Sequence, residues 1–188
     1  MSTDVALLGQ MVRPTRRERR AERRRLRRLD ALSARLAELH SIHALLEQAV
    51  KVVDAGWVQG AWFTVAGASG PRVVTGQEVD LALDRPVIGA CLVGGVVQAA
   101  GGPATVRSQL VQRTLDLTWH AMREDAAQPV RWCPGPRVRM MHVLELTYWN
   151  DAPERTKADV LDLLEAAQET AALQRHRCRA EQAVLTTS

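Results

Sequence analysis

The segment WNDAPERT, residues 149–156, carries side chains that can bind a ligand. Asn150 and Asp151 offer polar oxygens, Trp149 offers a ring for stacking, and Arg155 adds a cation. The same residue types are typical of a turn between helices, because Asn and Asp side chains hydrogen-bond to nearby backbone groups. Arg155 can then pair with Asp151, and Trp149 can anchor the turn. We favour the structural interpretation and keep these four residues as a candidate ligand turn.

Cysteine and histidine are the other residues able to do chemistry. Cys91 is expected in the first turns of a helix, where the helix dipole favours a thiolate, and His120 or His142 could serve as its base. This combination is compatible with a Cys-His hydrolase. The small residues around Cys91 favour tight packing instead, and a buried cysteine is usually inert. No catalytic residue is assigned, and a Cys-dependent enzyme is the third functional hypothesis.

Metal and cofactor motifs are not found in the sequence. His40 and His43 have no Cys or carboxylate set nearby, and His176 would not share a helix face with Cys178. The three cysteines form no CxxC pair, which argues against a zinc ribbon and a disulfide framework. The chain contains no Walker loop, GxGxxG, HExxH or GxSxG sequence. The sequence predicts neither a metal nor a cofactor.

An arginine-rich arm, residues 13–28, is the strongest charge feature. Its net charge is +8, which leaves −4 on the rest of a chain whose total is +4. Such an arm can bind a polyanion, contact an acidic protein surface, or be only the solvated end of a helix. It lacks the Asn and Ala positions that would read base edges, so we expect phosphate contact without sequence readout. The candidate nucleic-acid-binding residues are Arg13, Arg16, Arg17, Arg19, Arg20, Arg23, Arg24, Arg25, Arg27 and Arg28.

The arm continues into a leucine seam. Thr15 and Glu18 form a capping box that predicts a helix from about Arg16 to Gly56. One bent helix and two consecutive helices divided at Ser41 both fit this segment. Apolar residues recur at coiled-coil spacing, and the stripe they form must be covered by something. The seam residues are Leu26, Leu29, Leu32, Leu36 and Leu39.

A long C-terminal helix is predicted from a capping signature at Thr156 to about Glu181. Its apolar positions match the seam: Val160, Leu164, Ala167 and Ala171. Its carboxylates are expected to face the arginines of the arm: Asp159, Asp162, Glu165 and Glu169. The apolar positions thin out beyond Ala172, which favours a homo-oligomer or a helical protein partner over a monomer.

The central part of the chain predicts shorter elements. A loop with a small hairpin across Gly67–Arg72 precedes a helix that runs from Asp84 to Gly101. A further amphipathic helix is expected over residues 103–126, with Val106, Leu110, Leu115, Trp119 and Met122 inside. Residues 138–149 are helix or strand, and Met141, Leu144 and Tyr148 fit one helical face. The predicted core includes Trp57, Trp62, Cys91, Trp119, Trp149, Leu161 and Leu164.

Three stretches occur in a distinctive order: DAGWVQGAW at residues 54–62, PVIGACLVGGVVQAAG at 86–101 and YWNDAPERTKADVLDLLEAA at 148–167. Together they resemble an actinobacterial and actinophage family known only as a domain of unknown function. The likeness covers roughly residues 42–170. It implies a compact, mainly helical domain and brings no activity, substrate or cofactor.

The chain as a whole has a globular composition, with 46% apolar and 24% charged residues among 188. We predict a mainly α-helical fold with a basic, leucine-striped arm over residues 1–41, a helical domain over 42–170, and a polar end over 171–188. The apolar runs are too short to cross a membrane, no signal peptide is evident, and the scattered cysteines suit a reducing compartment. A cytoplasmic location is therefore expected.

The functional hypothesis is a non-enzymatic accessory protein whose arm binds nucleic acid or another polyanion without sequence readout. The alternative is a protein-protein adaptor or assembly component, related to a phage or mobile element, that uses the leucine seam. The expected partners are nucleic acid or an acidic protein surface, with a second copy or a helical partner on the seam and no membrane.

Overall fold

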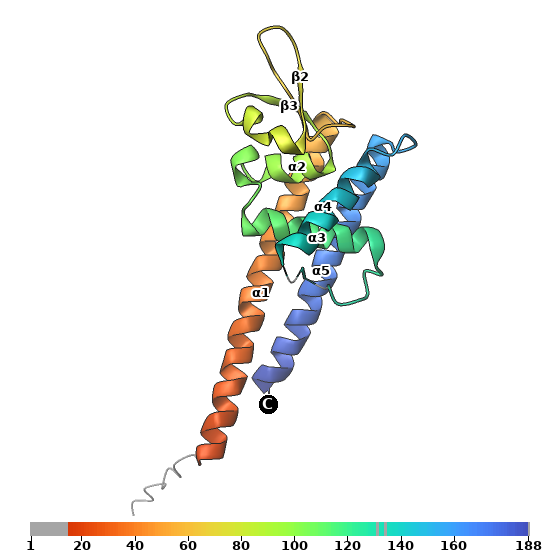
Figure 1. Ribbon diagram of the computed structural model, residues 1–188. Helices are drawn as coiled ribbons and strands as arrows, with labels where there is room; N and C mark the ends of the chain where they lie inside the picture. The colour runs from red at the N-terminus through yellow and green to blue at the C-terminus, as the bar shows by residue number, and fades with distance from the viewer. Residues whose placement is uncertain (1–14, 131, 134, 188) are drawn as a thin grey trace, which may run out of the picture.

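A computed structural model describes residues 15–130, 132, 133 and 135–187, and its architecture is mainly helical with one small sheet (Figure 1). This confirms the predicted fold class, including the long helices at both ends. The α-helices are α1 (Arg16–Ala55), α2 (Leu92–Ala99), α3 (Gln109–Arg123), α4 (Pro136–Asn150) and α5 (Lys157–Thr187). Short 3₁₀ helices lie at η1 (Gly76–Ala82) and η2 (Pro103–Thr105). Among the described residues, no helix is long and apolar enough to cross a bilayer.

Helices α1 and α5 lie side by side and run antiparallel (Figure 1). At one end Lys157 Nζ lies 2.9 Å from Asp54 Oδ1, and at the other Arg25 Nε donates to the Leu185 carbonyl at 2.7 Å. The predicted capping box begins α1, with Thr15 Oγ1 accepting from the Glu18 N–H. The helix continues through Ser41, whose hydroxyl bonds the Ala37 carbonyl at 3.1 Å. The segment is therefore one helix and not two.

Packing within the chain, chiefly of α5 on α1, covers most of the leucine seam. Leu32 and Leu39 are buried, Leu29 and Leu36 are partly buried, and Leu26 remains 48% exposed. On α5 the predicted inward residues Val160, Leu164, Ala167 and Ala171 are all buried. Intramolecular packing therefore removes most of the apolar stripe from water.

The predicted pairing of α5 carboxylates with the arm is wrong. Because the two helices are antiparallel, Asp159, Asp162, Glu165 and Glu169 lie at the end of α5 farthest from the arginines. The carboxylate that reaches the arm is that of Glu181, which accepts from Arg28 Nε at 2.6 Å. The relative direction of the two helices determines which carboxylates lie near the arm, and the periodicity of apolar residues does not reveal that direction.

A three-stranded antiparallel sheet occupies the end of the molecule opposite the arm. The strands β1 (Phe63–Val65), β2 (Arg72–Val74) and β3 (Val87–Ala90) follow the order β2-β1-β3, with Phe63 opposite both Val74 and Ala90. The β1–β2 pair confirms the predicted hairpin. The predicted helix from Asp84 is wrong in its first half, because residues 87–90 pair with β1 and the helix begins only at Leu92.

Two glycines let the first turn of α2 pack closely on its neighbours. A Cβ on Gly94 would overlap the carbonyl oxygen of Trp62, and one on Gly95 would lie 2.6 Å from Val53 Cγ2 of α1. The helix is buried along nearly its whole length. This agrees with the expectation that the small residues around Cys91 pack tightly.

Helix α3 begins later than predicted. Gly102 adopts a positive φ, residues 103–105 form a 3₁₀ turn, and Ser108 caps the helix by accepting from the Val111 N–H at 3.3 Å. Helices α1, α2, α4 and α5 all contact α3. Its burial therefore extends beyond one apolar face and includes polar residues. Of the predicted inner residues only Leu115 is buried, while Val106, Leu110, Trp119 and Met122 are partly buried.

Helix α4 confirms that residues 138–149 are helical, but the expected inner face is wrong. Met141, Leu144 and Tyr148 are exposed, Tyr148 to 72%, and the buried residues are His142, Leu146 and Asn150. Apolar residues occupy both sides of this helix. Their spacing therefore could not identify the side that faces the core.

Two residues of the predicted core, Cys91 and Leu164, are fully buried. The others are less buried than predicted: Leu161 and the four predicted tryptophans pack against the core and are only partly buried. Tryptophan carries an N–H that needs a partner, so its ring often lies at the edge of a core. Trp57 Nε1 donates to Asn150 Oδ1 at 3.0 Å, and Trp119 Nε1 donates to Glu145 Oε2 at 2.9 Å.

We predict that Gly94→Ala lowers the free energy of unfolding by about 1–3 kcal/mol, because the new methyl group must displace the β1 backbone or α2. Urea unfolding followed by circular dichroism measures this. Gly135→Ala is the control, since among the described residues no atom beyond its chain neighbours lies within 4 Å of its Cβ position and its φ is −170°. Equal effects at the two positions would contradict the packing assigned to Gly94.

Candidate functional site

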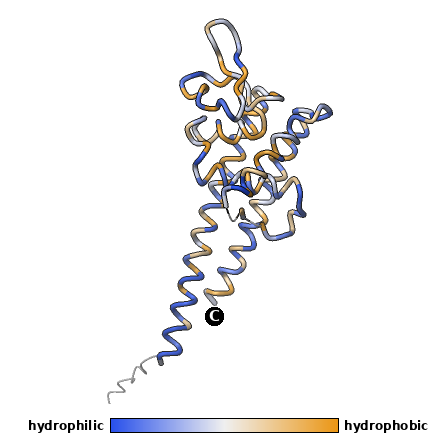
Figure 2. Tube along the Cα trace, viewed as in Figure 1, coloured by the Kyte–Doolittle hydropathy of each residue, from blue (hydrophilic) through white to orange (hydrophobic). Residues whose placement is uncertain are grey.

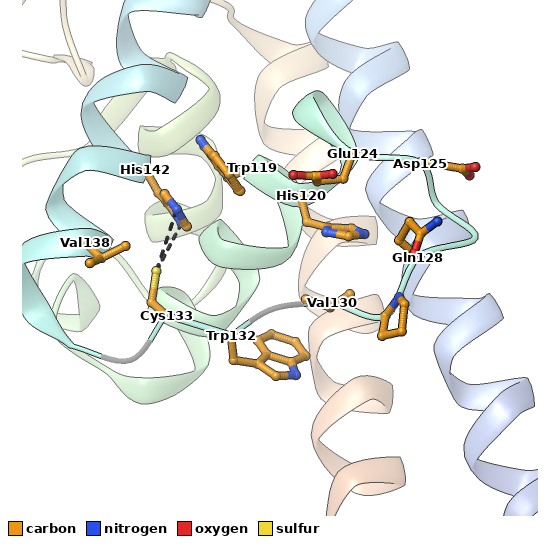
Figure 3. A pocket seen from close by; sticks show the side chains of 11 residues that line it. Trp119, His120, Glu124, Asp125, Gln128, Val130, Trp132, Cys133, Val138 and His142 are labelled. Carbon is orange, nitrogen blue, oxygen red and sulfur yellow. Dashed lines mark hydrogen bonds between the residues drawn. The ribbon is translucent and has the colours of Figure 1, made fainter.

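A pocket of about 860 Å³ lies between α3, α4 and the segment that joins them (Figure 3). Apolar and aromatic walls with a few polar groups are typical of small-molecule sites. The polar and aromatic side chains of this wall include Trp119, His120, Trp132, Cys133 and His142. The pocket therefore places a thiol and two imidazoles at one surface.

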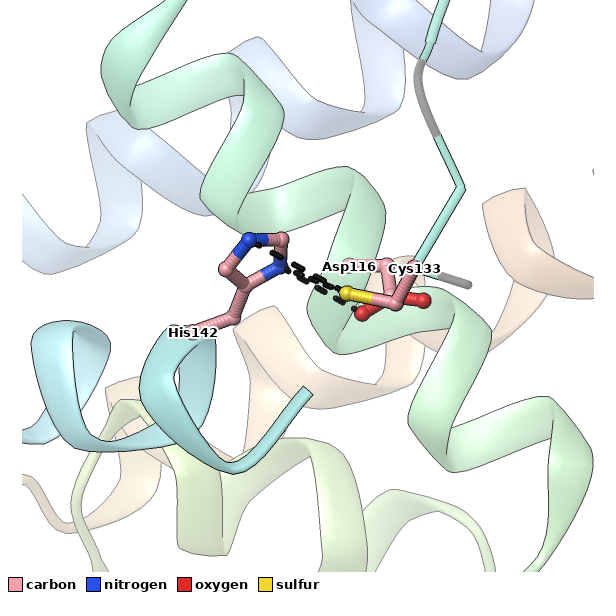
Figure 4. Close-up of side chains that lie close together, drawn as sticks. All are labelled: Asp116, Cys133 and His142. Carbon is pink, nitrogen blue, oxygen red and sulfur yellow. Dashed lines mark hydrogen bonds and ion pairs between the residues drawn. The ribbon is translucent and has the colours of Figure 1, made fainter. Parts of the chain in front are cut away.

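Three polar side chains converge at the edge of this pocket: Asp116 from α3, Cys133 from the joining segment and His142 from α4 (Figure 4). Cys133 Sγ lies 3.1 Å from His142 Nδ1, and the same nitrogen lies 3.5 Å from Asp116 Oδ1. All three residues are buried. We call them the Asp-Cys-His cluster.

Asp116 is the least satisfied member of the cluster. Its side chain is fully buried, and neither carboxylate oxygen has a hydrogen-bond partner. The nearest cation is Arg139, whose Nε lies 3.6 Å from Asp116 Oδ2. A buried carboxylate without hydrogen bonds is costly, so its retention calls for a positive partner.

The ring of His142 is held by its neighbours. Trp119 stacks on it with 3.7 Å between the ring centroids and an interplanar angle of 4°. The indole of Trp119 is fixed in turn by Glu145, whose pKa is lowered chiefly by this hydrogen bond. The imidazole therefore presents Nδ1 to Cys133 and Asp116 in a defined orientation.

The cluster does not have the geometry of a nucleophile and its base. In such a relay, the third group orients the imidazole through the nitrogen that does not face the nucleophile. Here Cys133 and Asp116 both approach Nδ1, and Nε2 lies 3.9 Å from the sulfur. Burial, and then the adjacent Asp116, raise the pKa of the Cys133 thiol to about 12. A protonated thiol is a poor nucleophile.

The sequence alone does not reveal this cluster. Of its three members only His142 is a predicted site residue, as a base for Cys91, and neither Asp116 nor Cys133 is among the predicted site residues. The three positions are separated by 16 and 8 intervening residues and match no short ligand motif. Only the docking of α4 on α3 brings them together.

Cys91 lies in a different environment. It is the N-cap of α2 and is fully buried, and its Sγ accepts from the Gly94 N–H at 3.4 Å. Burial raises its pKa to about 12 despite the hydrogen bonds from the helix start. Because the thiolate is strongly disfavoured, the structure gives no support to a nucleophilic role for Cys91.

Asn150, the last residue of α4, connects three parts of the fold. Its Oδ1 accepts from Trp57 Nε1 at 3.0 Å and from the Leu92 N–H at 3.1 Å, and its Nδ2 donates to the Val58 carbonyl at 3.2 Å. Nδ2 also donates to Asp151 Oδ1 at 2.8 Å. The side chain thus caps the first turn of α2 and anchors the segment after α1, while remaining fully buried.

The other residues of the turn have local partners. Asp151 Oδ1 accepts from the Gly60 N–H at 3.0 Å. Arg155 donates to the Trp149 carbonyl at 3.2 Å and places its guanidinium 4.0 Å from the centre of the Trp149 ring. The expected Arg155–Asp151 pair is replaced by an Arg155–Asp159 ion pair at 3.8 Å. These contacts agree with the structural interpretation, and ligand binding by the turn stays a prediction.

The described arginines of the arm all lie on the first turns of α1, the most hydrophilic part of the helix (Figure 2). Arg13 lies outside the described residues. Arg25 and Arg28 contact α5 through the Leu185 carbonyl and Glu181, and Arg25 also pairs with Glu22. Within the described part of the chain, no ion pair involves Arg16, Arg17, Arg19, Arg20, Arg23, Arg24 or Arg27.

Comparison with known protein families identifies the family to which the chain belongs. A model for a family of unknown function (DUF6197) matches residues 37–170, and the chain belongs to that family. The match spans the part of the chain from the middle of α1 into α5, and it includes the Asp-Cys-His cluster and Asn150. No curated protein and no solved structure matches the chain.

We predict that Asn150→Ala lowers the free energy of unfolding by about 2–4 kcal/mol, because the Leu92 N–H and the Val58 carbonyl lose their partner. Chemical denaturation provides the measurement. Tyr148→Ala serves as the control on the same helix, because this side chain is exposed and its loss should change stability by less than about 0.5 kcal/mol. A stability loss for Asn150→Ala no larger than the control would contradict the anchoring role.

We also predict that Cys91 resists thiol reagents in the native protein. With a pKa of about 12 its thiolate fraction at pH 8 is about 10⁻⁴, and the sulfur is shielded from solvent. Peptide mass spectrometry after alkylation measures the modification of each cysteine, and the same reaction in urea supplies the fully accessible rate. Rapid labelling of Cys91 in the folded protein would restore the catalytic hypothesis.

Proposed function

We propose that the arm of α1 binds nucleic acid or another polyanion through its arginines, without reading base sequence. The observation that carries this proposal is the set of seven arginines that have no acidic partner among the described residues. All seven are exposed. Guanidinium groups match phosphate oxygens with paired N–H donors, and a dense set of them supplies affinity without specificity.

The position of the arm supports the same proposal. Leu185, near the end of α5, lies beside Arg25, so residues 16–24 extend beyond the α5 helix (Figure 1). Most of the circumference of α1 is therefore accessible over these turns. A phosphate backbone can approach the helix from more than one side without displacing part of the fold.

The distribution of charge favours an external partner. The rest of the chain carries a net charge of −4, yet the described ion pairs between α5 and the arm are limited to the one between Glu181 and Arg28. Most of the positive charge is therefore not neutralised within the molecule. Exposed like charges on one helix repel one another, and a bound polyanion relieves that repulsion.

The leucine seam supports a second proposal, a protein-protein adaptor or assembly component. Leu26 is 48% exposed at the point where the seam enters the arm, which leaves an apolar contact next to the arginines. The proposed phage or mobile-element context and the actinobacterial origin derive from the GWxQG, GACLxGG and WNDxxxRT motif order. A partner helix or a second copy would extend the α1–α5 contact at this position.

We predict that replacing Arg16, Arg20, Arg23 and Arg27 together with Gln weakens binding to a fluorescent DNA duplex by at least tenfold at moderate salt. For duplex DNA, the slope of log K against log salt should fall by about 1 for each arginine that contacts a phosphate. Fluorescence anisotropy across a salt series measures both quantities. Duplexes of unrelated sequence should bind equally.

The matched control replaces four exposed arginines outside the arm, Arg72, Arg85, Arg107 and Arg137, with Gln. Net charge changes by the same amount in both variants, so only the position of the charge differs. Binding that depends on the arm survives in the control. Equal losses in the two variants, or no detectable binding of wild-type protein to DNA, RNA or heparin, would contradict the proposal.

A further inference from the structure

We propose that the Asp-Cys-His cluster binds a divalent transition-metal ion of the zinc class, with Asp116, Cys133 and His142 as its protein ligands. The ligand atoms of the three residues lie within 4.8 Å of one another and come from three separate parts of the chain. This site is independent of the arm and of the polyanion proposal.

Two of the three separations between ligand atoms are close to those around one tetrahedral ion. Zinc bonds of about 2.3 Å to sulfur and about 2.0–2.2 Å to nitrogen or oxygen place neighbouring ligand atoms roughly 3.4–3.6 Å apart. The observed separations are 3.1 Å between Cys133 Sγ and His142 Nδ1, and 3.5 Å between His142 Nδ1 and Asp116 Oδ1. These two need shifts of only a few tenths of an ångström to hold the ion, and the cysteine and aspartate ligand atoms lie within 4.8 Å of each other.

The state of Asp116 points to a cation. Both of its oxygens are buried and lack hydrogen bonds, although hydrogen-bond donors satisfy most buried carboxylates in folded proteins. Arg139 Nε lies 3.6 Å from Asp116 Oδ2, which is too far for a hydrogen bond, so this nitrogen also lacks a hydrogen-bond partner. A metal ion bound to Oδ1 supplies a direct ligand contact that this oxygen lacks and leaves Oδ2 for Arg139.

The types of ligand select the class of metal. Thiolate and imidazole are soft or borderline donors that favour Zn²⁺, Co²⁺ and similar ions, whereas Ca²⁺ and Mg²⁺ require sets of oxygen ligands. A single carboxylate among three ligands cannot form such an oxygen set. When the ion binds, Cys133 Sγ exchanges its proton for the metal, and that proton passes to solvent.

The surroundings resemble the outer shell of a metal site, in which neighbouring groups orient the ligands. Trp119 stacks on His142, and Arg139 approaches Asp116 while donating to Gln112 Oε1 at 2.7 Å. Three protein ligands leave a fourth position for water or a small molecule, as in catalytic zinc sites. Cys133 and His142 line the pocket, which gives a small molecule room beside the ion.

Titration of the full-length, metal-free protein with CoCl₂ tests the site. We expect one equivalent of Co²⁺ to bind and to produce the near-ultraviolet absorption of a cobalt-thiolate bond together with visible bands of a four-coordinate ion. ZnCl₂ should displace the cobalt and remove these bands. The absorption identifies a cysteine ligand directly, so adventitious binding at surface histidines does not imitate it.

Three single-cysteine variants form a matched set. Cys133→Ser should abolish the thiolate absorption and weaken Co²⁺ binding by more than about 100-fold, while Cys91→Ser and Cys178→Ser, which also replace buried cysteines, should keep both. Asp116→Asn retains the size of the side chain and should weaken binding in the same direction. Circular dichroism of each metal-free variant establishes that it is folded.

A second measurement does not depend on the cysteine variants. ZnCl₂ at a stoichiometric amount should raise the Tm of the wild-type protein and leave that of Asp116→Asn unchanged. Three outcomes would overturn the proposal: no stoichiometric cobalt binding by the wild-type protein, thiolate absorption that survives in Cys133→Ser, or loss of the absorption in Cys91→Ser. Each can occur whether or not the arm binds nucleic acid.

Discussion

The antiparallel packing of α1 on α5 is the constraint on which the rest of the structure depends. The two long helices pack along their lengths and bury Leu32 and Leu39 of α1, and the shorter elements pack on this helical pair. Because α5 runs only as far as the position of Arg25, the first turns of α1 project with their arginines exposed. One apolar interface therefore both holds the fold together and separates the arm from it.

The central position of α3 has a second consequence. Because α1, α2, α4 and α5 all contact α3, little of its surface is exposed to water, and some of its polar residues are buried. Asp116 and His120 are buried in this way, and His142 joins them from α4. Buried ionisable groups are costly unless they are paired, and they gather at functional sites more often than elsewhere. The architecture of the core thus creates the environment that distinguishes the Asp-Cys-His cluster.

Asn150 and the cluster illustrate two uses of buried polarity. Asn150 has a partner for each of its polar groups and connects the segment after α1 with the start of α2. Asp116 lies in an equally buried position without a single hydrogen bond to its carboxylate. A satisfied network stabilises one arrangement of the chain, whereas a buried carboxylate without hydrogen bonds can accept a further ligand. The difference separates a structural turn at the end of α4 from a candidate binding site between α3 and α4.

Local sequence determined four features: the two long helices, the capping box at Thr15, the β1–β2 hairpin and the concentration of arginine in the arm. Each of them depends on residues that are close together in the chain. Only tertiary structure decided that Val87–Ala90 is a strand paired with β1, that α4 turns His142 inward and Tyr148 outward, and that Glu181 reaches the arm. The Asp-Cys-His cluster belongs to this second group. Its residues have no common periodicity or spacing, and their proximity arises from the way α4 docks on α3. Sequence patterns report which face of a segment can be buried, while the choice of neighbour depends on packing between segments that are distant in the chain.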